Sequence, residues 1–129
     1  MMICPCGTKR NYDACCAPFH KGEALPQTAE KLMRSRYSAF VKAEITYLKD
    51  TYWPKFQRDF DEASYRARAI NSTWLGLEIE ATDGGESAET TGTVTFVATS
   101  MTQGSINKQR EKSLFKKKAG RWYYVEQID

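Results

Sequence analysis

The sequence lacks any apolar run long enough to cross a membrane, and it has one histidine, no internal repeat and no low-complexity segment. A membrane-spanning helix needs about 20 mostly apolar residues. A secretion signal also needs an apolar run, and residues 1–3 lead into cysteine without one. We therefore expect a soluble cytoplasmic protein with one domain and a small appendage. Its net charge of +3 is too small to indicate nucleic acid by itself.

Cysteine occurs only within one stretch of thirteen residues, at Cys4, Cys6, Cys15 and Cys16. Four thiolates this close in the sequence can surround a tetrahedral zinc ion, and Gly7 lets the backbone turn. The stretch has too few apolar residues for a core, so metal binding would supply its folding energy. Iron also suits four thiolates, and both metals stay open with zinc as the default. A redox pair of adjacent cysteines and two structural disulfides are the alternatives.

The stretch Cys4–Cys16 reads Cys-Pro-Cys-Gly, then a basic segment, a tyrosine and Cys-Cys, and it resembles the SEC-C motif. That motif is a small zinc-binding module, best known from the C-terminus of the bacterial protein-translocation ATPase, where partners contact it. The resemblance implies that the four cysteines ligate zinc and that a protein partner binds the module. His20 lies beyond the motif and is expected to be an ordinary loop residue.

The residues after the cysteines change in composition. Two prolines and a glycine between positions 17 and 26 predict an extended linker, which Phe19 and Leu25 would attach to the main body. We therefore divide the chain into a metal-binding segment with its linker, residues 1–26, and a main domain, residues 27–129.

The first half of the main domain has helical periodicity. Apolar residues recur every three or four positions over residues 29–42, which predicts an amphipathic helix with Thr28 as its N-cap. Two shorter helices are expected over residues 45–52, ended by Pro54, and over residues 62–70.

After residue 71 the pattern alternates between apolar and polar residues, which is typical of half-buried strands. Strands are expected near residues 75–79, 90–101, 108–118 and 121–128, with glycine-containing turns between them. Helices followed by four consecutive strands predict an α+β domain with an antiparallel meander.

This order of elements is similar to the nuclear transport factor 2-like fold, a cone in which a curved sheet wraps around helices. Residues 32–40, Tyr47-Leu48 before Thr51, residues 74–77 and residues 122–124 also resemble the YchJ family. That family pairs an N-terminal SEC-C motif with a nuclear transport factor 2-like domain and has no established activity. The resemblance covers nearly the whole chain. It implies helices packed in the concavity of a curved four-stranded antiparallel sheet, with a small cysteine-rich metal module.

A cone of this type leaves a cavity, which related folds use for catalysis or for binding, so the fold does not decide the function. The side chains that we expect in it are Arg36, Tyr37, Trp74, Phe96, Glu111, Trp122 and Tyr124. An enzyme would need an acid or a base there, such as Glu111 or a tyrosine, and Arg36 could hold an anion. The sequence leaves catalysis open, and we favour a protein without it.

Two arginines of the first long helix lie two positions apart. On a helix, side chains so placed diverge by about 200°, so Arg34 and Arg36 cannot face one pocket. We expect Arg36 and Tyr37 to face the cavity and Arg34 to pack toward the cysteines.

Seven cations accompany a single acid near the end of the chain: Lys108, Arg110, Lys112, Lys116, Lys117, Lys118 and Arg121, which we call the basic strip. Such a strip could bind RNA phosphates. Apart from Phe115, which belongs to the apolar end of this strand, no aromatic residue interleaves it to stack bases, so we favour a solvated hairpin whose charges protect a sheet edge.

Three functions from different classes remain. We favour a zinc-binding interaction protein with a protein partner at its metal module. The alternatives are an enzyme or small-molecule binder that uses the cavity, and an RNA- or ribosome-associated protein that uses the basic strip. The oligomeric state stays open, and a dimer could form through the sheet.

Overall fold

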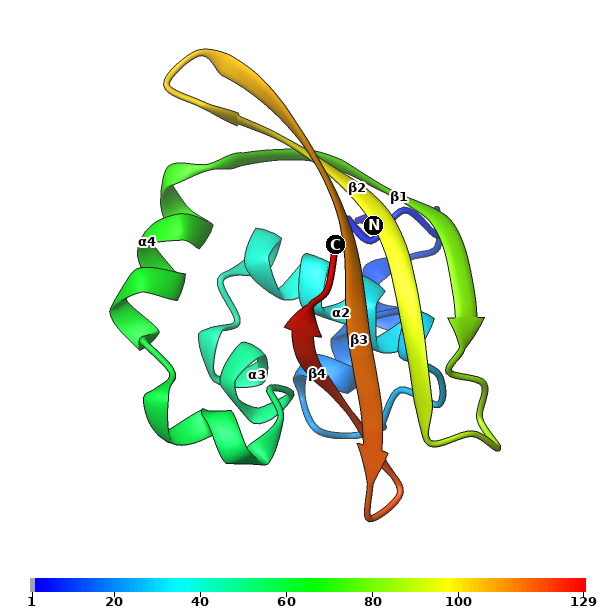
Figure 1. Cartoon of the computed structure of the whole chain (residues 1–129). Coiled ribbons are helices and arrows are strands. Elements are labelled where there is room, and N and C mark those ends of the chain that lie inside the picture. The colour runs from blue at the N-terminus through cyan, green and yellow to red at the C-terminus, as the bar shows by residue number, and fades with distance from the viewer. Residues whose placement is uncertain (1) are drawn as a thin grey trace.

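The computed structural model describes residues 2–129 of the chain. The helical elements come first along the chain, and four strands follow them (Figure 1). They are η1 (Tyr12–Ala14), α1 (Ala17–His20), α2 (Ala29–Lys42), α3 (Ile45–Asp50), η2 (Pro54–Asp59), α4 (Glu62–Asn71), β1 (Thr73–Gly84), β2 (Thr91–Thr102), β3 (Ser105–Lys118) and β4 (Arg121–Gln127).

The four strands form one antiparallel sheet in the order β1-β2-β3-β4, and the sheet curves around the helices (Figure 1). Tight turns at Gln103-Gly104 and Ala119-Gly120 join the last three strands, with positive φ at all four residues. Two-residue turns of this geometry match the natural twist of a hairpin. The register of β1 shifts twice against β2, which helps to bend the sheet. The predicted α+β fold, with helices in the concavity of a curved four-stranded sheet, is confirmed.

Helix α2 runs through the concavity and contacts both the other helices and the sheet. Its N-cap is the predicted one, since the Thr28 hydroxyl accepts a hydrogen bond from Lys31 N at 3.1 Å. Its apolar face packs with side chains of the sheet in the main core, where Leu32, Phe115 and Trp122 are almost fully buried. The burial of these residues fixes the helix against the sheet and so sets the positions of its polar side chains.

The segment after α3 pairs with β4 along the outer edge of the sheet. Tyr124 N donates to Thr51 O at 2.8 Å, and Trp53 N donates to Tyr124 O at 2.8 Å. This pairing closes the cone on one side and brings Thr51 close to α2.

Several predicted boundaries are wrong. Residues 17–20 form α1 and are not extended, because a proline is tolerated in the first turn of a helix. For the same reason Pro54 begins η2, while α3 has already ended at Asp50. Leu25 is 43% exposed and does not attach the linker. Strand β3 begins at Ser105 because the preceding turn takes only two residues.

The segment from residue 2 to residue 20, which we call the cysteine module, packs against α2 through α1 and through its loops. The division of the chain at residue 26 stays a prediction. Within residues 2–129, no helix has the length and apolar character that crossing a membrane requires.

Candidate metal centre and cavity

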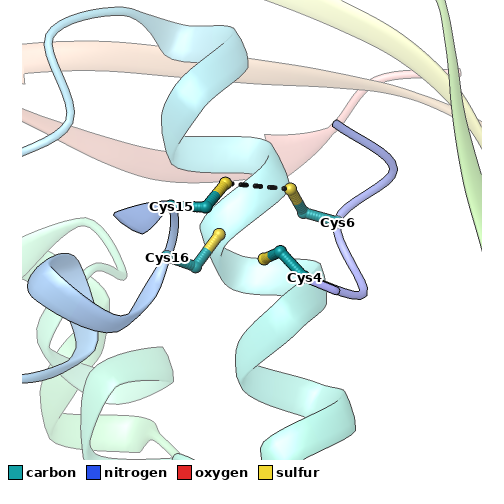
Figure 2. Close-up of side chains that lie close together, drawn as sticks. All are labelled: Cys4, Cys6, Cys15 and Cys16. Atoms are coloured by element: carbon teal, nitrogen blue, oxygen red, sulfur yellow. Dashed lines mark hydrogen bonds between the residues drawn. The ribbon is translucent and has the colours of Figure 1, made fainter. Parts of the chain in front are cut away.

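The four cysteines meet at one point of the cysteine module. Their sulfur atoms all lie within 4.8 Å of one another, and the Sγ atoms of Cys6 and Cys15 are 3.6 Å apart. Cys4 and Cys6 approach from one loop, and Cys15 and Cys16 approach from the other side, with all four side chains pointing inward (Figure 2). All four thiols are free. The spacing along the sequence therefore does bring the four sulfur atoms together.

This donor set fits a four-thiolate metal shell. Metal–sulfur bonds of about 2.3 Å in a tetrahedron place the sulfur atoms about 3.8 Å apart, close to the separation of Cys6 and Cys15. Cys4, Cys6 and Cys16 are at most 2% exposed, and Cys15 is half-buried. A shell this enclosed leaves no open ligand position, which is typical of a structural site.

Local backbone pairing explains why the two halves of the module meet. Cys4 N donates to Arg10 O at 2.7 Å, and Tyr12 N donates to Met2 O at 2.8 Å. Gly7 makes the turn between them with a φ of +90°, and a Cβ atom there would lie 2.9 Å from Leu77 O of β1. Glycine is needed here both for the left-handed backbone and for the close approach to the sheet.

The thiols do not ionise alike. A hydrogen bond from the Cys16 thiol lowers the pKa of Cys6 to about 4. The same contact, followed by burial, raises the pKa of Cys16, and burial raises the pKa of Cys15. One thiolate is thus favoured and further ones are opposed by their neighbours. A divalent cation would remove this opposition through its own charge.

Arg34 of α2 joins the metal centre to the cone. Its Nη1 donates to Cys6 O at 2.7 Å, and its Nε donates to a Glu30 carboxylate oxygen at 3.0 Å. One turn later, Ser38 Oγ lies 3.8 Å from Cys4 Sγ. The expected orientation of Arg34 toward the cysteines is confirmed, and its charge is balanced within the chain.

His20 forms a second connection between the module and α2. Its Nε2 lies 2.9 Å from Ser35 O, and its Nδ1 lies 2.7 Å from Tyr12 Oη. Because a carbonyl can only accept, Nε2 carries the proton and Nδ1 accepts from the Tyr12 hydroxyl. Burial lowers the pKa of His20, which favours this neutral form. The expectation of an ordinary loop residue is wrong, since His20 lies in α1 and attaches the module.

A cavity of about 500 Å³ lies between the helices and the concave face of the sheet. Its walls come from α2, α4 and all four strands. Six of the seven expected side chains line it: Arg36, Tyr37, Trp74, Phe96, Glu111 and Tyr124. Trp122 is the exception, because it is 1% exposed in the core and donates its Nε1–H to Gln27 O at 3.1 Å.

The basic strip does not form one continuous surface. Arg110 pairs with the Glu80 carboxylate, Lys117 lies 5.3 Å from the Trp122 ring, and Lys108 borders the cavity. Strand β4 pairs with β3 over residues 113–118, and residues 128 and 129 bond the backbone of Lys112. Lys108 and Arg110 therefore flank the part of this β3 edge that has no neighbouring strand among the described residues. This arrangement is what edge protection requires.

The fold also places aromatic rings beside the strip, which the sequence order does not indicate. The Trp53 ring lies 6.0 Å from Lys116 Nζ and 5.8 Å from Lys118 Nζ. Arg121 lies 5.6 Å from the Tyr123 ring, which packs edge-on against Trp53. Aromatic rings from outside the strip therefore lie beside its cations, which an expectation based on the residues within the strip did not include.

A family model described as "YchJ, middle NTF2-like domain" matches residues 28–127. The chain belongs to the YchJ family. The matched range contains the residues that line the cavity and none of the four cysteines. The family assignment therefore covers the cone, and the metal centre depends on its own geometry and on the similarities to other proteins below.

Proteins of the same family resemble the chain over most of its length. It is 44% identical to UPF0225 protein GSU1048 of Geobacter sulfurreducens over 96% of this chain and 77% of that protein. It is 42% identical to UPF0225 protein SCO1677 of Streptomyces coelicolor over 95% of this chain and 92% of that protein. These relatives carry family designations without a named activity.

Solved structures extend the similarity to the cysteine module. The solution structure of RPA3114, a SEC-C motif containing protein from Rhodopseudomonas palustris, matches with a TM-score of 0.90 and 33% identity, over 99% of this chain and 100% of that one. A crystal structure of a SEC-C motif containing protein from Psychrobacter arcticus matches with a TM-score of 0.86 and 30% identity. This match covers 98% of this chain and 81% of that one. Both cover the cysteines as well as the cone.

In this YchJ-family chain the cavity also contains polar residues that sequence reasoning missed. Ser113 lies in its wall and is fully buried, and Tyr65 and Arg68 of α4 border it. Ser113 lies two residues from Glu111 on β3, so strand alternation places both on one face. That alternation was a signal from which Ser113 could have been found. Nothing local indicated the residues of α4.

Proposed function

We propose that this YchJ-family protein is a zinc-binding interaction protein of the bacterial cytoplasm. Its cysteine module holds one zinc ion and presents a contact surface to a partner protein. The observation that carries the proposal is the convergence of four sulfur atoms within 4.8 Å in a segment whose own buried cluster consists of these cysteines and Tyr12. A zinc ion in a closed four-thiolate shell supplies a structural cross-link, and the chain's own residues then make the contact surface.

The surface of the module supports a role in binding a partner. Met2 and Ile3 precede the first ligand and are 56% and 62% exposed. Lys9 and Arg10 follow Cys6 and are exposed as well. Exposed apolar side chains beside cations suit a protein partner that has an apolar patch and acidic residues. The cone supplies a rigid body behind this surface through Arg34 and His20.

Metal analysis of the full chain, purified under reducing conditions, tests the proposal. We expect about one zinc ion per chain, and loss of the ion in Cys15→Ser and Cys16→Ser variants while the cone stays folded. Ile3→Ser is the matched control, since its side chain is exposed and is not a ligand. This variant should keep the metal and weaken partner binding. Protein without metal, in which Cys15 and Cys16 readily cross-oxidise, would instead support a redox function.

A second candidate function rests on Trp53. Its ring lies beside Lys116 and Lys118, and base stacking on an aromatic ring flanked by cations is a common mode of single-strand RNA binding. Joint replacement of Lys116 and Lys118 by alanine should weaken binding of an RNA oligonucleotide and reduce its dependence on salt. Joint replacement of Lys108 and Arg110 is the control at the other end of β3. RNA binding that both pairs weaken equally would indicate general attraction to positive charge.

A further inference from the structure

The polar residues of the cavity are incompletely satisfied by the protein. Arg36 is 5% exposed, and its Nη1 donates to Leu48 O at 2.8 Å and to Thr51 Oγ1 at 2.6 Å. A guanidinium has five N–H donors, and these two bonds use only those on Nη1. Among residues 2–129, no group accepts a hydrogen bond from Nε or Nη2 of Arg36. No carboxylate in that range pairs with it either.

A buried positive charge without a counter-charge is costly, and burial accordingly lowers the pKa of Arg36. Part of the cost is offset by the Tyr124 ring, whose centroid lies 4.7 Å from Arg36 Cζ. An arginine nevertheless keeps its proton in proteins, so the charge is retained. Arg36 lines the cavity, so its remaining donors are available to an anion that enters it.

Ser113 gives an independent indication at the same place. Its side chain is fully buried, lines the cavity, and its Oγ has no hydrogen-bond partner among the described residues. A buried hydroxyl without a partner is unusual in a folded protein. Ser113 precedes Phe115 on the same face of β3, and Phe115 is the cross-strand neighbour of Tyr124. Arg36, Ser113 and Tyr124 all line the cavity.

We propose that the cavity binds a small carboxylic acid with a flat apolar body, whose carboxylate pairs with Arg36 and accepts a hydrogen bond from Ser113. The volume of about 500 Å³ lies within the usual range for small-molecule sites. The planar guanidinium matches a carboxylate with two parallel hydrogen bonds. Aromatic side chains of Tyr37, Trp74 and Phe96 line the walls where the body of the ligand would lie.

Glu111 narrows the range of possible ligands further. It lies two residues from Ser113 on the same face of β3, about 7 Å farther along the strand. Its carboxyl group suits a hydroxyl or amine donor on the far side of the ligand from the carboxylate. Its negative charge also disfavours a second negative charge, such as that of phosphate, on a ligand held at Ser113. A monocarboxylate is therefore the better fit.

Titration of the full chain with 4-hydroxybenzoate, followed by amide and indole NMR shifts, tests the proposal. This probe has a carboxylate, a flat ring and a hydroxyl opposite the carboxylate. We expect saturable shifts at Ser113, Tyr124 and the Trp74 indole. The uncharged 4-hydroxybenzamide has the same shape and should bind at least about tenfold more weakly. Equal binding of the amide, or no shift at these residues, would overturn the proposal. Stronger binding of inorganic phosphate at these residues would also overturn it.

Variants distinguish a binding role from a structural one. Arg36→Lys keeps the charge but loses the planar fork, and it should weaken 4-hydroxybenzoate binding about tenfold. If this variant does not fold, Ser113→Ala still distinguishes a binding role from a structural one. Removal of a buried hydroxyl without a partner should raise the Tm and weaken probe binding severalfold. Ser105→Ala, an exposed serine of the same strand, is the matched control and should change neither. Unchanged probe binding in Ser113→Ala would contradict the assignment.

Discussion

The metal centre and the cavity differ in how their residues come together. All four cysteines lie within residues 4–16, so local turns and backbone pairs gather them. The cavity takes its polar groups from α2 to β4, and only the packed core holds Arg36 close to Tyr124. A short segment can thus form a site once a metal replaces the core that it lacks, whereas the cavity depends on the whole cone.

Helix α2 contributes an arginine to each region, and the two arginines differ in how their charges are balanced. Arg34 pairs with Glu30 and also bonds Cys6 O. Arg36, on another face of the helix, bonds two oxygens of the α3 segment and pairs with no carboxylate among the described residues. The first arginine completes a structure, and the second leaves capacity for a ligand. This contrast separates a structural region from a binding region.

Removal of the metal should break the comparison most clearly. Because structural zinc supplies about 10–16 kcal/mol in small modules, a chelator should release residues 2–16 and leave the cone folded. Hydrogen exchange would then show loss of amide protection over the module and unchanged protection in β2 and β3. Loss of protection throughout the chain would show that the module and the cone unfold as one unit.

Gly7 allows a test of how the module depends on the sheet. An alanine there would need a φ of +90° and would clash with Leu77 O, so we expect Gly7→Ala to weaken zinc affinity at least about tenfold. Gly22→Ala is the matched control, because Gly22 has a similar φ of +76° with nothing within 4 Å of the added Cβ. Competition with a chromogenic chelator measures both variants. A similar loss of zinc affinity in the two variants would mean that the weaker binding comes from backbone strain and not from the contact with β1.

Local patterns predicted much of the fold for clear physical reasons. The cap at Thr28 is where expected, because a side-chain oxygen there satisfies a free backbone N–H whatever the tertiary structure. The cysteine spacing indicated the meeting of the four sulfur atoms for a similar reason, since a turn of so few residues brings its ends together. These features require no knowledge of distant parts of the chain.

The cavity could be predicted only in part. Trp122 and Tyr124 share one face of β4, so alternation cannot tell which of them packs in the core and which borders the cavity. The difference between them depends on residues that are distant in the sequence. The Trp122 indole N–H donates to Gln27 O, and the Tyr124 ring lies beside Arg36. The position of Trp53 beside the basic strip likewise depends on a backbone pairing with β4 that no local pattern indicates.

His20 offers a smaller, pH-dependent test of the attachment between the two regions. Burial lowers its pKa below the ordinary 6.5, so the unfolded chain binds a proton more readily than the folded one. The contribution of the neutral His20 side chain to the stability of the folded chain is fully present above pH 6.5. It is lost as the pH falls through the lowered pKa. His20→Gln, which keeps an acceptor and a donor, should lose this part of the pH dependence in thermal unfolding. A pH profile identical to that of the wild type would show that His20 does not titrate on unfolding.

The smallest expected effect concerns Glu111 in the cavity. Its effect on stability depends on pH in the opposite direction to that of His20. Burial raises the pKa of Glu111 above the ordinary 4.5, although the charge of Arg68 opposes the shift. The folded protein therefore binds the proton more readily, and stability falls as the pH rises from 4.5 through the raised pKa. Glu111→Gln removes this loss, so its Tm should match the wild type near pH 4 and exceed it slightly at pH 7. A Tm advantage that shrinks as the pH rises would mean that Arg68 stabilises the ionised carboxylate more than burial opposes it. The cavity would then already hold a balanced pair of charges in Glu111 and Arg68, whereas Arg36 has no carboxylate partner among the described residues.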